Sequence, residues 1–230
     1  MSSDTTTAVQ SRIPKPHQGM LKITEIFHSL QGEARDAGRP TVFIRLTGCP
    51  LRCVYCDSEY AFHGGEWMHI DQIMDKTASY GTQYVCVTGG EPLAQKRCFD
   101  LLESLCEAGY QVSLETSGAI DVSEVDQRVS RVVDIKTPDS GEVERNLWAN
   151  LDTLSAHDQV KFVICSREDY DWSVSEIRSR DMEKKFEILF SPAWGQVNAT
   201  ELATWVLQDQ LNVRVQLQLH KLLWGDVAGK

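Results

Sequence analysis

Residues 41–58 of the chain read TVFIRLTGCPLRCVYCDS. The first six residues are rich in β-branched and aromatic types, which is typical of a strand. A loop that carries Cys49, Cys53 and Cys56 follows at once. Cysteine thiolates are the usual protein ligands of a [4Fe–4S] cluster, and its four irons each need a terminal ligand, so three cysteines leave one iron open. The stretch therefore predicts a strand that ends in an iron–sulfur site.

Two other readings of this loop are a structural zinc site and three unrelated thiols. Zinc requires a fourth ligand, for which His63 is the candidate, and closed zinc sites usually show paired C-x-x-C spacing, which is absent here. Unrelated cysteines sit in cores as small hydrophobic residues. We expect that role for the other four cysteines, which are Cys86, Cys98, Cys106 and Cys165.

Composition limits the classes of partner. The chain has 230 residues, with 23 Lys and Arg against 33 Asp and Glu, for a formal net charge of -10. This charge repels a phosphate backbone, so we expect no nucleic acid partner. No apolar run approaches the ~20 residues that cross a bilayer, and the N-terminus has no signal-peptide pattern. We therefore expect no membrane partner and a cytoplasmic location, and seven cysteines fit metal binding in a reducing compartment.

Strand-like runs alternate with helical stretches along the chain. The strands are expected at residues 41–46, 84–88, 111–116, 131–136, 160–165, 186–190 and 213–217, and the clearest helices at residues 69–80 and 96–108. This alternation predicts an α/β fold with a mostly parallel sheet of about six strands, closed only partly into an open or truncated (β/α) barrel. Residues 1–20 read as a flexible tail and residues 21–230 as a single domain.

Polar clusters follow three of these strands, at the edge of the sheet where α/β folds carry their chemistry. Gly90 and Glu91 follow the strand at residues 84–88, and two glycines there allow a close backbone approach. The next two strands lead to Thr116 and Ser117 and to Asp134 and Lys136. Plain turns and a solvated lysine are the alternatives for these residues. Residues 191–194, which include Trp194, are a weaker candidate for an adenine contact.

The spacing Cys49-x-x-x-Cys53-x-x-Cys56, with Tyr55 before the last cysteine, resembles the signature of the radical S-adenosylmethionine (SAM) enzymes. The resemblance implies that SAM chelates the open iron, and that one electron cleaves it to methionine and a 5′-deoxyadenosyl radical that abstracts a hydrogen atom. It also implies a set of SAM contacts, namely Tyr55, Asp57, Gly90, Glu91, Thr116, Ser117, Asp134 and Lys136.

The segments FHSLQGE at residues 27–33 and VQLQLHK at residues 215–221 resemble the 7-carboxy-7-deazaguanine synthase family, and the resemblance runs from about Leu21 to about Leu223. It implies a Mg²⁺-dependent conversion of 6-carboxy-5,6,7,8-tetrahydropterin to 7-carboxy-7-deazaguanine, with loss of ammonia, on the route to queuosine, by a homodimer. The implied substrate contacts are Leu30, Gln31, Gly32, Glu33, Arg45, Thr88, Glu115 and His220, with Arg45 as a bidentate partner of the substrate carboxylate.

Four positions depart from the family pattern. Ser58 stands where the family usually has the threonine that binds Mg²⁺, and it keeps the hydroxyl. Ala34 replaces a usual glycine, and residues 134–136 read DIK where many members have SPK. Because Arg45 interrupts an apolar strand, an unpaired charge there would be costly, and we expect an anionic partner for it.

The resemblance implies that no side chain acts as an acid or base, because the adenosyl radical performs the abstraction. A flavodoxin or ferredoxin is the expected electron donor. An activating enzyme for a glycyl-radical protein shares the cysteine spacing and is the alternative within the superfamily. The alternative from another class is a zinc-stabilised binding module, which would be colourless and indifferent to SAM.

Overall fold

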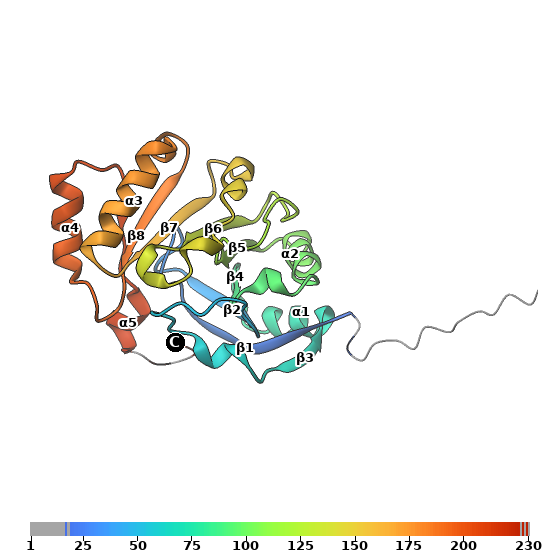
Figure 1. The fold of residues 1–230 in the computed structure, drawn as a ribbon. Helices are drawn as coiled ribbons and strands as arrows, with labels where there is room; N and C mark the ends of the chain where they lie inside the picture. The colour runs from blue at the N-terminus through green and yellow to red at the C-terminus, as the bar shows by residue number, and fades with distance from the viewer. Residues whose placement is uncertain (1–16, 18, 226, 228, 230) are drawn as a thin grey trace, which may run out of the picture.

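The computed structural model describes residues 17, 19–225, 227 and 229. A nine-stranded sheet in the order β3-β1-β2-β4-β5-β6-β7-β8-β9 forms the centre of the fold. Figure 1 shows this sheet as a curved wall with helices along its outer side. The strands are β1 (Met20–Leu30), β2 (Pro40–Leu46), β3 (Glu66–His69), β4 (Tyr84–Gly89), β5 (Gln111–Thr116), β6 (Ser130–Ile135), β7 (Gln159–Ile164), β8 (Glu187–Pro192) and β9 (Arg214–Val215).

The order of strands and helices confirms the α/β fold with a mostly parallel sheet. Every neighbouring pair from β2 to β9 is parallel, whereas β1 runs antiparallel to both β2 and β3. Connections between parallel strands must cross over the sheet, and helices provide most of these crossovers. The helices are α1 (Ile70–Ala78), α2 (Cys98–Glu107), α3 (Arg167–Ser179), α4 (Ala199–Gln208) and α5 (Leu219–Trp224), with short 3-10 turns between them.

The expected number of about six strands was wrong, because the sheet has nine. Two of the additional strands, β1 and β3, extend the sheet beyond β2 through antiparallel pairs. The strand β9 contains only two residues, Arg214 and Val215, although the sequence predicted a strand over residues 213–217. The alternation of strands and helices in the sequence predicts only the parallel strands that helices connect. Strands outside this alternation were therefore not counted.

Two groups of buried apolar side chains fill the space between the sheet and the helices. The first joins α1 and α2 to strands from β1 to β5, and the second joins α3 and α4 to strands from β6 to β8. In α2 the predicted stripe is confirmed, since Cys98, Leu101, Leu102, Leu105 and Cys106 are all buried. The helix ends before Gly109, whose φ of 86° suits a residue without a side chain. This packing leaves the opposite face of the curved sheet for the site.

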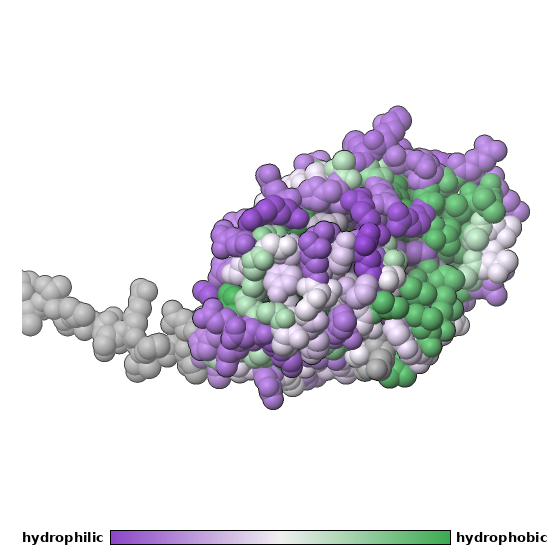
Figure 2. Space-filling view, turned by 180° about the vertical axis from the view of Figure 1, so that it is seen from behind, coloured by the Kyte–Doolittle hydropathy of each residue, from purple (hydrophilic) through white to green (hydrophobic). Residues whose placement is uncertain are grey.

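Exposed apolar side chains gather at one end of the molecule, where α4 and α5 lie (Figure 2). They include Leu207, Leu217, Leu222, Leu223 and Trp224. Within the described residues, no helix is long and apolar enough to cross a membrane. The tail expected over residues 1–20 falls mostly outside the described residues, since residues 1–16 and 18 are not among them.

Candidate active site

One cavity of about 420 Å³ lies at the carboxyl ends of the parallel strands, and it brings most of the predicted site residues together. Its walls come from the loops after β1, β2, β4, β5, β6 and β8, and from the segment around α5. The predicted residues that line it are Leu30, Gln31, Glu33, Arg45, Cys49, Cys53, Tyr55, Cys56, Asp57, Ser58, Thr88, Gly90, Glu115, Thr116, Ser117, Asp134, Lys136 and His220. Gly32 and Glu91 are the two predicted site residues that do not line it.

The cysteine loop forms one wall of this cavity. Cys49, Cys53 and Cys56 are unpaired thiols of intermediate exposure, and all three line the cavity. The Val54 amide donates to the Ser140 carbonyl over 3.0 Å, which fastens the loop to the turn after β6. Burial raises the pKa of Cys53 to about 11, so a metal must displace a proton there. Three thiols on one cavity wall form the donor set that a [4Fe–4S] cluster with one open iron requires.

Gly90 is needed because the end of β4 lies directly against the cysteine loop. A Cβ at this position would lie 2.5 Å from the carbonyl oxygen of Gly48 and 2.7 Å from the Cβ of Cys49. The Gly90 amide also donates to the Leu46 carbonyl over 3.3 Å. No larger residue fits without moving the backbone of the cysteine loop, which explains the glycine that the sequence placed here.

Glu91 is buried behind the cavity wall, with no exposed surface. Its carboxylate accepts from the Leu93 amide over 2.9 Å, from the Thr116 hydroxyl over 3.0 Å and from the Ser117 amide over 2.7 Å. The Ser117 hydroxyl donates to it as well. These donors satisfy the carboxylate, so in this structure Glu91 joins the ends of β4 and β5 and does not face a ligand. Thr116 and Ser117 reach the cavity, with their hydroxyls committed to Glu91.

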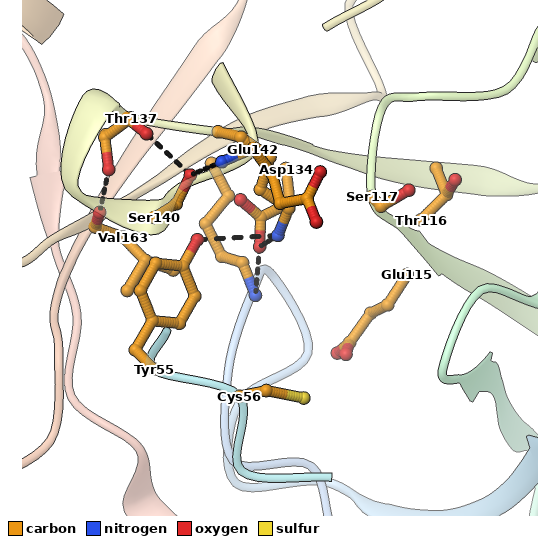
Figure 3. Close-up of polar contacts among 12 residues, drawn as sticks. Tyr55, Cys56, Glu115, Thr116, Ser117, Asp134, Thr137, Ser140, Glu142 and Val163 are labelled. Carbon is orange, nitrogen blue, oxygen red and sulfur yellow. Dashed lines mark hydrogen bonds and ion pairs between the residues drawn. The ribbon is translucent and has the colours of Figure 1, made fainter. Parts of the chain in front are cut away.

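Charged residues at the end of β6 face the cysteine loop. The Lys136 ammonium lies 3.1 Å from the Asp134 carboxylate and 5.5 Å from the centre of the Tyr55 ring. Burial opposes the charge of Lys136, but the Asp134 carboxylate overcomes it and raises the lysine pKa. One oxygen of Asp134, Oδ1, is buried and has no hydrogen-bond partner among the described residues. Figure 3 shows Tyr55, Cys56, Asp134 and Glu115 around this part of the cavity, which all four residues line.

Arg45 has the anionic partner that its place in β2 required. The Nε atom donates to Glu25 over 2.8 Å, and Glu25 also accepts from the Tyr60 hydroxyl over 2.8 Å. An irregularity in the register of β1 between Ile23 and Glu25 places Glu25 opposite Arg45. Burial alone would lower the pKa of Arg45, but Tyr60 and Glu25 raise it. Among the described residues, the two terminal nitrogens make one hydrogen bond, from Nη1 to the Gly89 carbonyl over 3.4 Å, which leaves N–H groups that can bind an anion in the cavity.

The loop after β1 brings Glu33 and Gln31 to the opposite wall. Glu33 accepts from the Gln218 amide over 2.8 Å and lies 3.1 Å from the Lys161 ammonium. Burial alone would raise the pKa of Glu33, but Lys161 and Gln218 lower it, which keeps the carboxylate charged. Gln31 is buried, with its backbone amide bonded to the Arg39 carbonyl over 2.8 Å.

Gly32 supports His220 and does not itself line the cavity. A Cβ on Gly32 would lie 2.1 Å from Nδ1 of His220, so the glycine makes room for the imidazole ring. The Leu219 amide donates to the Gly32 carbonyl over 3.0 Å, which fixes the start of α5 against the loop. Burial lowers the pKa of His220, so this ring is a neutral imidazole at neutral pH.

Glu115 and Ser58 have few protein partners. The Thr88 hydroxyl donates to Glu115 over 3.4 Å, and burial raises the Glu115 pKa despite the nearby Lys161. Within the part of the chain that the structure describes, the Ser58 hydroxyl makes one contact, 3.9 Å to the Cys56 sulfur, so it keeps lone pairs that could bind a metal ion. Asp57 is held by Lys221 at 3.2 Å and by Gln218 at 3.1 Å. Carboxylate and hydroxyl oxygens are ligands that suit Mg²⁺.

Sequence reasoning missed several residues at the site. Lys161 in β7 and Gln218 before α5 both bind Glu33. Glu25 binds Arg45 and does not line the cavity. A signal existed for Lys161, since a lysine inside the apolar run QVKFVI needs a partner, as Arg45 does. Glu25 carries no such signal, because its role depends on the register irregularity in β1.

Comparisons with known proteins agree with this site. Residues 43–138, which contain the cysteine loop, match the radical SAM superfamily. A 7-carboxy-7-deazaguanine synthase from Chlorobaculum tepidum is 45% identical over 90% of this chain and 96% of its own length. The corresponding protein from Koribacter versatilis is 44% identical over 89% of this chain and 97% of its own length.

Solved structures share the fold. The crystal structure of QueE from Escherichia coli superposes with a TM-score of 0.73, at 23% identity, over 87% of this chain and 95% of that chain. The crystal structure of Streptococcus suis SuiB bound to S-adenosylmethionine gives a TM-score of 0.52 over 74% of this chain and 45% of that chain, at 14% identity. On the close sequence relatives, this chain belongs to the 7-carboxy-7-deazaguanine synthase family of radical SAM enzymes.

Proposed function

We propose that this enzyme converts 6-carboxy-5,6,7,8-tetrahydropterin to 7-carboxy-7-deazaguanine and ammonia, on the route to queuosine and other 7-deazapurines. The observation that carries the proposal is Arg45, whose guanidinium is fixed by Glu25 at one nitrogen and lines the same cavity as the three cysteines. A carboxylate of a small molecule fits the two terminal nitrogens of this guanidinium. The names of the close relatives give the proposal its second support.

As a radical SAM enzyme, the protein uses a [4Fe–4S] cluster and SAM. Cys49, Cys53 and Cys56 are the proposed cluster ligands, and the proposed SAM contacts are Tyr55, Asp57, Gly90, Thr116, Ser117, Asp134 and Lys136, all of which line the cavity. When bound, the reduced cluster and SAM supply a 5′-deoxyadenosyl radical. For Glu91 we propose an indirect role, since its carboxylate positions Thr116 and Ser117 from behind the wall.

The chain's own residues bind and orient the substrate in this proposal. Arg45 binds the carboxylate at C6, and Gln31, Glu33 and Glu115 offer amide and carboxylate groups to the polar edge of the pterin. His220, kept neutral by burial, can donate or accept one hydrogen bond. The substrate and the product plus ammonia have equal atoms and electrons, so no net oxidant is needed and no side chain must act as an acid or base. The proposed work of the protein is therefore positioning and exclusion of water.

Further parts of the function are proposals by family analogy. Ser58 is the proposed Mg²⁺ ligand, because its hydroxyl makes one long contact, to Cys56, among the described residues. A flavodoxin or ferredoxin is the proposed electron donor, the cytoplasm the proposed location, and a homodimer the proposed assembly. The exposed apolar side chains near α5 give a second subunit a surface to cover. We also propose that residues 21–230 form a single domain.

Anaerobic turnover tests the proposal. Reconstituted protein is mixed with 6-carboxy-tetrahydropterin, SAM, Mg²⁺ and a reductant, and 7-carboxy-7-deazaguanine and ammonia are measured by mass and by an enzymatic assay. We expect the two products in equal amounts, with product in excess over the SAM that is cleaved. SAM cleavage to 5′-deoxyadenosine without any deazaguanine would refute the proposed substrate and favour the activating enzyme of a glycyl-radical protein.

Two cysteine variants test the proposed cluster ligands. Cys53→Ala removes a proposed ligand, and we expect iron content and SAM cleavage to collapse. Cys165→Ser is the matched control, because Cys165 is also a partly exposed free thiol but does not line the cavity. This control is expected to keep its iron and its activity.

A further inference from the structure

We propose that Lys161 is a positioning residue of the site: its ammonium, 3.1 Å from Glu33, fixes the Glu33 carboxylate at the cavity wall, where Glu33 accepts hydrogen bonds from the donor edge of the substrate. This inference rests on the proposed function, since the amino group and ring N–H groups of a pterin are the donors that Glu33 would meet.

Lys161 reaches the cavity because of its place in β7. Along this strand Val160, Phe162 and Ile164 are buried in the core that α3 covers, whereas the side chains between them face the other way. Lys161 lies opposite Asp134 of β6 in the parallel register. The lysine is therefore directed into the cavity from the middle of the sheet, and only 12% of its side chain is exposed.

The contacts of Lys161 are unequal. Its Nζ atom lies 3.1 Å from Oε2 of Glu33 but 3.7 Å from Oδ2 of Asp134. Asp134 has a closer cation of its own, Lys136, at 3.1 Å. Glu33 has no second cation among the contacts of the described residues, only the amides of Gln216 at 3.3 Å and Gln218 at 2.8 Å. Removal of Lys161 thus leaves Glu33, and not Asp134, without a counter-ion.

The Lys161 ammonium offsets the cost of burying the Glu33 charge, since only 12% of the Glu33 side chain is exposed. Without Lys161, burial and the neighbouring Asp57 carboxylate would both favour the protonated form of Glu33. A protonated carboxyl loses part of its capacity to accept hydrogen bonds, and its geometry is no longer fixed by the ammonium. Lys161 therefore acts on the substrate through Glu33, without needing to touch it.

The test is equilibrium binding of 6-carboxy-tetrahydropterin to the anaerobic holoprotein with SAM and without a reductant, by isothermal titration calorimetry. For Lys161→Met we expect the pterin Kd to rise by at least about tenfold, the size expected for a lost hydrogen bond to a charged group. The SAM Kd should change by less than about threefold, because Asp134 keeps Lys136. Lys184→Met, at a side chain that is 78% exposed, is the matched control and should bind as the wild type does.

A double-mutant cycle separates a positioning role from a general structural one. In a Glu33→Gln background, Lys161→Met should weaken pterin binding by less than about threefold, because the carboxylate that it positions is gone. Additive losses in the double variant would overturn the inference, as would equal losses of pterin and SAM affinity. If Lys161→Met does not fold, as judged by circular dichroism and iron content, Lys161→Gln takes its place in the same cycle.

The outcome for the wild type distinguishes the two proposals. Wild-type protein that neither binds nor converts the pterin overturns the proposed function and this inference together. Wild-type protein that binds the pterin, with an unchanged Kd in the Lys161 variants, overturns the inference alone.

Discussion

Two glutamates near the ends of neighbouring strands differ in how well the protein satisfies them. Glu91, after β4, accepts from Leu93, Thr116 and Ser117 and has no exposed surface. Glu115, in β5, lines the cavity and accepts one hydrogen bond from the described residues, a 3.4 Å contact from the Thr88 hydroxyl. Both are acidic residues beside the same site, so residue type does not separate them. The number of hydrogen-bond donors does separate them: the donors around Glu91 fill its acceptor sites, whereas Glu115 keeps acceptor sites that a ligand can use.

The largest loss of stability is expected when Glu91 is replaced. Glu91→Ala leaves the Leu93 and Ser117 amides and the Thr116 hydroxyl without their acceptor in a buried place. We expect the free energy of unfolding to fall by about 3 kcal/mol or more, measured by anaerobic urea denaturation. Glu103→Ala, at an exposed position of α2, is the control and should change it by less than about 0.5 kcal/mol. A small loss for Glu91→Ala would contradict the structural role assigned to this carboxylate.

Arg45 is intermediate between Glu91 and Glu115 in how many protein partners it has. Glu25 accepts from its Nε atom, and the two terminal nitrogens can bind a ligand. Arg45→Lys keeps the positive charge but loses the planar fork. We expect the pterin Kd to rise by about 30-fold, which is about 2 kcal/mol, with iron content and SAM cleavage retained. Calorimetric titration measures the Kd, and Arg39→Lys, at a side chain that is 55% exposed, is the control. An unchanged Kd for Arg45→Lys would count against the fork.

The sequence predicted the cavity better than it predicted which groups face it. The cysteine loop and most of the strand-end residues meet as expected, because parallel strands bring their carboxyl ends to one edge. The position of Glu91 behind the wall was not predictable, since the motif gives the residue type but not the direction of its side chain. An anionic partner for Arg45 was expected from the sequence. Which residue it is depends on the register of β1, which is set by its pairing with β2.

Stability as a function of pH gives a smaller test of the same contrast. Burial raises the pKa of Glu115 above its usual value near 4.5, so the folded state resists the charged form. This carboxyl therefore stabilises the fold below that pH and loses its contribution as the pH rises through the raised pKa. At neutral pH we expect Glu115→Gln to be more stable than the wild type by about 1 kcal/mol, and the gain should vanish near pH 4. Urea denaturation over this range measures it.

Glu33→Gln should show the opposite sign in the same series. Burial opposes the charge of Glu33, but Lys161 and Gln218 lower its pKa, so its contribution is present above the usual pKa and is lost as the pH falls. The Glu33→Gln variant should therefore be less stable than the wild type at neutral pH. Equal pH dependence in the two variants would show that the two carboxyls do not differ in their partners.

The smallest change in stability is expected at Ala34, where a hydrogen bond from the backbone amide holds a strained backbone conformation. Ala34 has a φ of 61°, and its amide donates to Gln216 over 2.8 Å in a buried place. Ala34→Gly relieves a left-handed strain of about 1 kcal/mol. It also loses a buried methyl group and makes the unfolded chain more flexible, by similar amounts. We therefore expect the free energy of unfolding to change by less than about 1 kcal/mol. Ala34→Val, which is β-branched, should lose more than that, and equal stabilities of the two variants would show that the hydrogen bond to Gln216 does not hold this φ.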